Sequence, residues 1–180
     1  MPQAVAHILI PLLIMSFIRD FIISKKEKRV FPLHYVMIAG IAGVIPDLDI
    51  GIYWIVHFFG ANFTDVHRTW AHTLFVPLIF LGIAFLTRKT EFISLRKHRL
   101  HLSMMFIMLA FGSFVHLILD ATFHGVIMPF YPLSYSSWGI DLFGYLPSVL
   151  ERLSAPTFDA ILIIFYLVYL EWKHKISDFI

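Results

Sequence analysis

The sequence contains no cysteine, which excludes disulfide bonds and thiolate metal ligands. Charged residues are also scarce: they make up 14% of the 180 residues, whereas soluble domains average about 25%. Hydrophobic residues account for 59% of the chain, and the mean hydropathy is +0.80. We therefore expect a single all-α, membrane-embedded domain over residues 1–180, in which any metal must be held by histidine, aspartate or glutamate.

Long apolar runs predict a helical bundle of about five transmembrane spans. The runs cover roughly residues 4–23, 33–60, 69–86, 102–121 and 157–172, with Ser154 or Thr157 as the N-cap of the last. The second run is interrupted at Pro46, because proline lacks the N–H group that a helix uses and clashes with the preceding turn. A broken span is tolerated where its backbone faces protein or a water-filled cavity.

The distribution of basic residues predicts the orientation of the chain in the membrane. Eleven of the fourteen lysine and arginine residues fall in two loops, 24–31 and 87–101, and in the C-terminal tail. Five spans place these three regions on one side, which the positive-inside rule makes cytoplasmic. We therefore expect a multi-pass protein of the inner (cytoplasmic) membrane, with the Pro46 break near the extracytoplasmic face.

Histidine and aspartate residues recur at that same face. Asp47 and Asp49 directly follow Pro46, while His116 and Asp120 are spaced i,i+4 and so lie on one face of a helix. Several candidates lie 14–16 residues from the cytoplasmic end of their span, about 21–24 Å away at about 1.5 Å per residue. The candidate metal ligands are His7, Asp47, Asp49, His67, His72, His116 and Asp120.

Imidazole nitrogens and carboxylate oxygens are the ligands that zinc accepts in the absence of thiolates. Seven candidates are generous for one divalent ion and reasonable for two. Asp49 is a candidate bridging ligand or general base, and Arg68, which follows His67, is a candidate clamp for an anionic group. Each feature also has a structural explanation: hydrogen-bonded histidines between helices, an Asp-x-Asp turn after proline, and an interfacial arginine paired with Asp65.

The candidate residues stand in motifs that resemble the YdjM-type family. The motifs are His7, Pro46-Asp47-Leu48-Asp49, His67-Arg68-x-x-x-His72, His116-x-x-x-Asp120-x-Thr122-x-x-Gly125 and Pro129-Phe130-Tyr131-Pro132. The family's members are described as inner-membrane-associated, metal-dependent hydrolases. The chain departs from the family pattern at Ile50, at Ala71 and Thr73 on either side of His72, and at Phe123, where the family often has His, Thr, Ser and Pro.

The resemblance implies hydrolysis of an ester or phosphoester at a divalent metal site, with one or two zinc ions as the expected cofactor. A site near the extracytoplasmic face favours membrane lipid and a small-molecule or lipid-like substrate as partners, and we expect no nucleic acid. The alternatives are a non-catalytic metal-binding scaffold and a transporter. The apolar cytoplasmic halves of the spans, such as residues 78–85 and 102–109, count against a transporter.

Overall fold

The computed structural model describes residues 4–23, 31–123 and 125–175, and its regular elements are helical apart from one isolated bridge between Ile127 and Trp138. The all-α prediction is therefore confirmed. Most of the first basic loop, residues 24–30, lies outside the described residues. The main helices are α1 (Ala4–Phe17), α2 (Leu33–Ala42), α3 (Asp49–Val56), α4 (Phe63–Val66), α5 (Phe75–Leu86), α6 (Ile93–Lys97), α7 (Leu102–Phe123) and α8 (Ser148–His174).

Three helical stretches are long and apolar enough to cross a membrane: Ala4–Phe21, Leu102–Phe123 and Ser148–His174. The first includes α1 and part of a π-helical turn, Ile18–Ile22. A fourth candidate is the pair Leu33–Ala42 and Pro46–Phe59, which meet at 49° and confirm the interrupted second span. The remaining expected span corresponds to α5, a shorter apolar helix of 12 residues.

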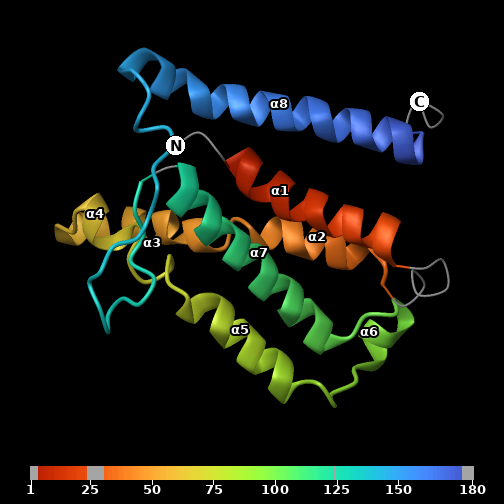
Figure 1. The fold of residues 1–180 in the computed structure, drawn as a ribbon. Helices are drawn as coiled ribbons and strands as arrows, with labels where there is room; N and C mark the ends of the chain where they lie inside the picture. Colours follow the sequence, from red (N-terminus) through yellow and green to blue (C-terminus); the bar gives the residue numbers. More distant parts are fainter. Residues whose placement is uncertain (1–3, 24–30, 124, 176–180) are drawn as a thin grey trace.

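Helix α7 lies at the centre of the bundle and packs against α5, α2 and α1 (Figure 1). Its contact with α2 is close, because a Cβ atom on Gly112 would collide with the carbonyl oxygen of Ala39 and the Cβ of Ala42. His116 follows Gly112 by four residues on the same helix face. This crossing therefore brings His116 to the break that follows α2.

A hydrophobic core begins at this crossing and continues along α1, α2 and α7. It is built around buried residues of α1, α2 and α7, namely Met15, Tyr35, Val36, Ala39 and Met108. The Tyr35 hydroxyl accepts a hydrogen bond of 2.6 Å from the backbone N–H of His101, just before α7 begins. The core thus fixes the relative positions of the three helices that carry much of the candidate site.

Helix α8 lies along α1 (Figure 1) and meets it through polar as well as apolar contacts. The Asp159 carboxylate accepts a 2.9 Å hydrogen bond from the Ala6 N–H group in the first turn of α1. Near the other end, the Tyr169 hydroxyl donates to Asp20 at 2.7 Å. Helix α8 is therefore tied to the start of α1 and to the π-helical turn that follows α1.

Two predicted helix boundaries were wrong. The last span begins at Ser148 instead of Thr157, because the helix continues through Pro156 at the cost of one backbone hydrogen bond. Ser154 lies inside this helix and donates to the Glu151 carbonyl at 2.7 Å, so it is not an N-cap. The third span begins at Phe75 instead of Thr69, because the residues before it form turns.

These turns, residues 67–74, are stabilised by their own side chains. The Thr69 hydroxyl donates to the Val66 carbonyl at 2.6 Å, and the Thr73 hydroxyl donates to the Trp70 carbonyl at 3.2 Å. The backbone N–H of Leu74 then donates to the Pro129 carbonyl at 2.9 Å, which attaches the turns to the long loop before α8. The turns direct two buried histidines, His67 and His72, inward.

Candidate metal centre

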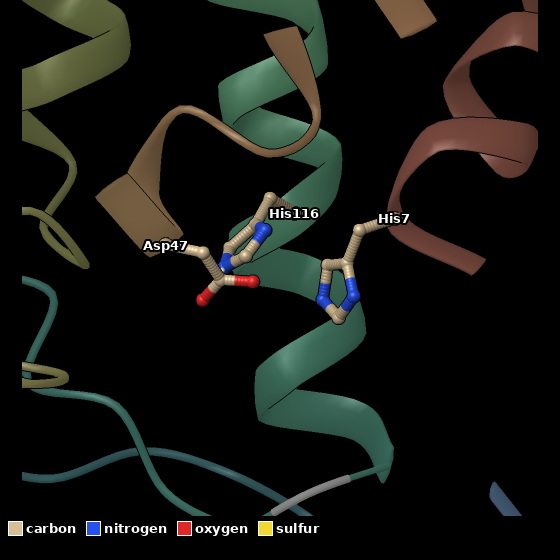
Figure 2. Close-up of side chains that lie close together, drawn as sticks. All are labelled: His7, Asp47 and His116. Atoms are coloured by element: carbon tan, nitrogen blue, oxygen red, sulfur yellow. Dashed lines mark ion pairs between the residues drawn. The ribbon is translucent and has the colours of Figure 1, made fainter. Parts of the chain in front are cut away.

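The predicted site residues come from four parts of the chain and meet at one end of the bundle. His7 lies in the first turn of α1, Asp47 and Asp49 follow Pro46 at the bend between α2 and α3, and α7 supplies His116 and Asp120. Figure 2 shows three of them, His7, Asp47 and His116, converging from these separate elements. The turns before α5 add the remaining three: His67, Arg68 and His72.

The orientation of His116 is fixed by the backbone of α2's C-terminal end. Its Nδ1 atom lies 2.7 Å from the carbonyl oxygen of Gly43, which can only accept, so Nδ1 carries the proton. In the neutral ring, Nε2 then carries a lone pair, and it lies 3.1 Å from Nε2 of His72. A Cβ atom on Gly43 would collide with the backbone carbonyl of His7, so glycine is needed for this close approach.

His72 is oriented from its far side in a similar way. It is fully buried, and its Nδ1 atom lies 3.2 Å from a carboxylate oxygen of Asp49. Because Nδ1 of His72 faces this carboxylate, its Nε2 faces the Nε2 of His116 at hydrogen-bond distance. Without an ion, one of these two nitrogens donates to the other; with an ion beside them, both can direct a lone pair at it.

Two carboxylates surround this pair of nitrogens. Oδ1 of Asp47 lies 3.4 Å from Nε2 of His72 and 3.6 Å from Nε2 of His116. Oδ2 of Asp120 lies 3.4 Å and 3.7 Å from the same two atoms. Two imidazole nitrogens and two carboxylate oxygens are a donor set that zinc accepts, so the chemistry of the cluster fits a divalent cation.

The remaining two histidines complete the cluster. Nε2 of His7 lies 3.2 Å from Asp120, and its ring centroid lies 4.1 Å from that of His116. The ring of His67 lies 4.9 Å from that of His72. Ligand atoms lie within 4.8 Å of one another in three overlapping groups that could hold an ion: His7–Asp47–His116, Asp47–His67–His72 and His72–His116–Asp120.

Asp49, expected as a bridging ligand or base, lies behind the histidines. One oxygen is 3.0 Å from Nδ1 of His67, and the other is 3.2 Å from Nδ1 of His72. The second oxygen also accepts a 3.3 Å hydrogen bond from the backbone N–H of Arg68. Only 4% of the Asp49 side chain is exposed, so both its oxygens are committed to these partners.

Arg68 lies beside the cluster and is more exposed than the ligands. Its Nε atom lies 3.6 Å from Asp120, and 31% of its side chain is exposed. Its backbone has a φ angle of +63°, which is uncommon for a residue other than glycine. Gly125, with a φ of +109°, lies against the guanidinium: a Cβ there would be 3.3 Å from Nη1.

Sequence reasoning missed two groups that shape the site. One is the Gly43 carbonyl, which no side-chain pattern could reveal. The other is Asp159, which is 8% exposed and holds the Ala6 N–H next to His7. A carboxylate in an apolar helix was the available signal, because such groups are costly in a membrane unless they have partners.

The fold and the cluster together define an all-helical membrane protein with a buried group of histidines and aspartates that could bind a metal ion. The chain belongs to the YdjM inner membrane protein family, whose sequence model matches residues 1–176. This finding confirms the family resemblance. No curated protein and no solved structure matches the chain significantly.

Proposed function

We propose that this protein is a membrane-embedded, metal-dependent hydrolase that acts on an ester or phosphoester. The observation that carries the proposal is the pair of Nε2 atoms of His72 and His116, 3.1 Å apart, each with a hydrogen-bond acceptor behind it. Histidine ligands in metal enzymes are oriented by such partners. Asp47 and Asp120 each lie within 3.4–3.7 Å of both nitrogens, so imidazole and carboxylate donors converge at this point.

In this proposal, residues of the three groups described above hold one or two divalent ions, zinc being the best fit to the donors. The ion would supply Lewis-acid chemistry and lower the pKa of a bound water toward about 7. Asp47 is the most exposed carboxylate of the cluster, with 18% of its side chain accessible, against 6% for Asp120. The side of the site next to Asp47 is therefore the more open to water.

Arg68 and Asp49 have different roles in this proposal. The guanidinium of Arg68 holds the anionic group of the substrate, since it lies beside the ligands and remains one-third exposed. Asp49 orients His67 and His72 and does not touch the substrate, because its oxygens already face both rings and the backbone of Arg68. Hydrolysis adds the oxygen of water to the acyl or phosphoryl centre, and the departing alcohol oxygen takes up a proton.

A substrate screen tests the proposed activity. Metal-loaded wild-type protein in detergent should hydrolyse at least one member of a panel of carboxylic and phosphate esters, including phospholipid-like compounds. His116→Ala protein, prepared identically, should show none of this activity. The hydrolase proposal is contradicted if the wild-type protein exceeds its own His116→Ala variant on no member of the panel.

We further propose that the site faces the extracytoplasmic side, as the distribution of basic residues indicates. Ser137 belongs to the long loop before α8 and lines a cavity with His67 and Arg68. Ser94 lies in α6, close to the first residue of α7, at the opposite end of the bundle. Both serines are exposed. In intact cells, a cysteine at position 137 should react with a membrane-impermeant thiol reagent and one at position 94 should not; the opposite labelling pattern would place the site in the cytoplasm.

A further inference from the structure

We infer that a cavity next to the metal centre binds an amphiphile that carries an anionic phosphate group on an apolar tail. The cavity has a volume of about 660 Å³, within the range of about 300–1,000 Å³ that ligand pockets occupy. It lies between α4, the turns at 67–74 and the long loop before α8. The inference rests on the proposed function for its chemistry, but the binding can be measured without it.

The cavity reaches the metal centre through two adjacent residues. His67 and Arg68 both line it, and the same two residues contact Asp49 and Asp120 of the cluster. A ligand in the cavity therefore meets a guanidinium and a candidate ligand histidine at one end. A phosphate group suits this end, because arginine forms strong, charge-assisted hydrogen bonds with phosphate oxygens.

The position of Arg68 is built into the backbone. Its uncommon φ angle of +63° is held by the hydrogen bond from its N–H group to Asp49. The side chain then passes Gly125, where an added Cβ atom would lie 3.3 Å from Nη1. Two local constraints thus position one arginine at the mouth of the site, which favours a binding role over a generally solvated charge.

The rest of the cavity suits an apolar tail. Its wall includes Phe63, Val126 and Met128, with Tyr135 and Ser137 as polar members. Tyr135 continues into an aromatic group on the surface, since its ring lies 5.5 Å from Tyr131, which in turn lies 5.1 Å from Trp70.

The surface around the cavity is of the kind found at a membrane interface. Tyr135 in the wall is 73% exposed, and Trp70, in the same aromatic group, is 63% exposed. In the 3₁₀ turn that follows α3, Phe58 and Phe59 are 85% and 86% exposed. Aromatic side chains of this kind are enriched where a membrane meets water. A ligand that enters from the bilayer would bring its tail along this surface and its head group to Arg68.

Equilibrium binding of decyl phosphate to the full-length protein, purified in dodecyl maltoside and treated with a chelator, tests the inference. The wild-type protein should bind decyl phosphate at least about tenfold more tightly than it binds decyl maltoside or glycerol phosphate. Only decyl phosphate carries both a phosphate group and an apolar tail. Removing the charge with Arg68→Gln should weaken binding about tenfold or more, as expected for loss of a charge-assisted hydrogen bond. Arg88→Gln, at an exposed arginine after α5, is the matched control and should leave binding unchanged.

A second pair of variants tests the apolar wall. Val126→Asp places a negative charge in the cavity and should also weaken binding about tenfold or more, by repelling the phosphate and solvating the wall. Leu142→Asp makes a comparable change on the same loop, at a half-exposed residue outside the wall, and should have no effect. Because 52% of Val126 is exposed, its replacement should not disturb folding.

Three results would overturn the inference: equal binding by Arg68→Gln and wild-type protein, equal effects of the two aspartate substitutions, or glycerol phosphate binding as tightly as decyl phosphate. The last result would identify a soluble phosphate compound as the ligand. Since the protein is metal-free in this assay, failure of hydrolysis would leave the binding result intact. Failure of binding would likewise leave the metal centre untouched.

Discussion

Replacement of His116 by alanine is expected to abolish binding of a divalent ion. Purified wild-type protein should carry at least about one equivalent of zinc or a similar ion, and the His116→Ala variant should carry almost none. His116 belongs to two of the three groups that could hold an ion, and it is fully buried with its Nε2 directed at the other donors. Removal of this ring leaves both of those groups short of a ligand and takes away the nitrogen that faces His72 of the third group.

Metal analysis together with thermal unfolding measures this effect. A ligand that binds the native state stabilises it by about 2.7 kcal/mol when its concentration is 100 times the dissociation constant. A chelator should therefore lower the melting temperature of the wild-type protein and leave that of His116→Ala unchanged. Asp47→Ala should behave like His116→Ala, because Asp47 also belongs to two of the groups.

A control variant separates loss of the ion from loss of a histidine in general. His98→Ala removes an exposed histidine that contacts only the His34 ring among the described aromatic contacts, and it should keep both the ion and the response to chelator. His116→Gln preserves most of the side-chain volume and should also lose the ion, which covers the case in which the alanine variant does not fold. Wild-type protein that is free of metal and indifferent to chelators would contradict the metal centre.

Much of this site could be predicted from the sequence because it depends on helical periodicity. His116 and Asp120 are four residues apart on α7, and the structure places their side chains 3.7 Å from each other, as that spacing requires. The break at Pro46 follows from the chemistry of proline alone. Depth along each helix then predicted that the ligands from α1, the bend and α7 share one layer.

The parts that could not be predicted lie outside regular helices or belong to the backbone. Residues 67–74 form turns, so the direction of the His67 and His72 rings does not follow from their spacing. The carbonyl group of Gly43 becomes a partner of His116 only when α2 ends beside α7. Asp49, two residues from Asp47, faces the opposite side of the histidines because a helix begins at that residue.

Replacement of Asp49 by asparagine is expected to leave a folded protein that binds metal about 10–100-fold more weakly, the usual effect of losing the partner of a ligand histidine. Asp49 lies within hydrogen-bond distance of Nδ1 of His67 and the N–H of Arg68, and its second oxygen is 3.2 Å from Nδ1 of His72. Asparagine has one oxygen and an NH₂ group in place of two accepting oxygens. At least one histidine would therefore face a donor. The proton of that ring would move from Nδ1 to Nε2.

Chelator competition measures the affinity, and ¹⁵N spectra of the histidine rings report which nitrogen carries the proton. Asp20→Asn is the matched control, since Asp20 is equally buried and accepts from Tyr169 and His174 at the far end of α1. Asp20→Asn should change stability without changing metal affinity or the tautomers of the site histidines. A purely structural role for Asp49 would predict the same outcome for both variants.

The turnover of the Asp49→Asn variant separates three accounts of this residue. With Asp49 as an orienting group, turnover of a phosphodiester or phospholipid-like substrate should fall about 10²-fold, in parallel with weaker metal binding, while Arg68→Ala loses turnover but keeps its metal. Lost turnover with wild-type metal affinity would show instead that Asp49 acts on the reacting atoms as a general base. Full cellular function in an Asp49→Asn, Arg68→Ala double variant would contradict the hydrolase, because a metal ion that only ties helices together needs neither an oriented open site nor an anion clamp.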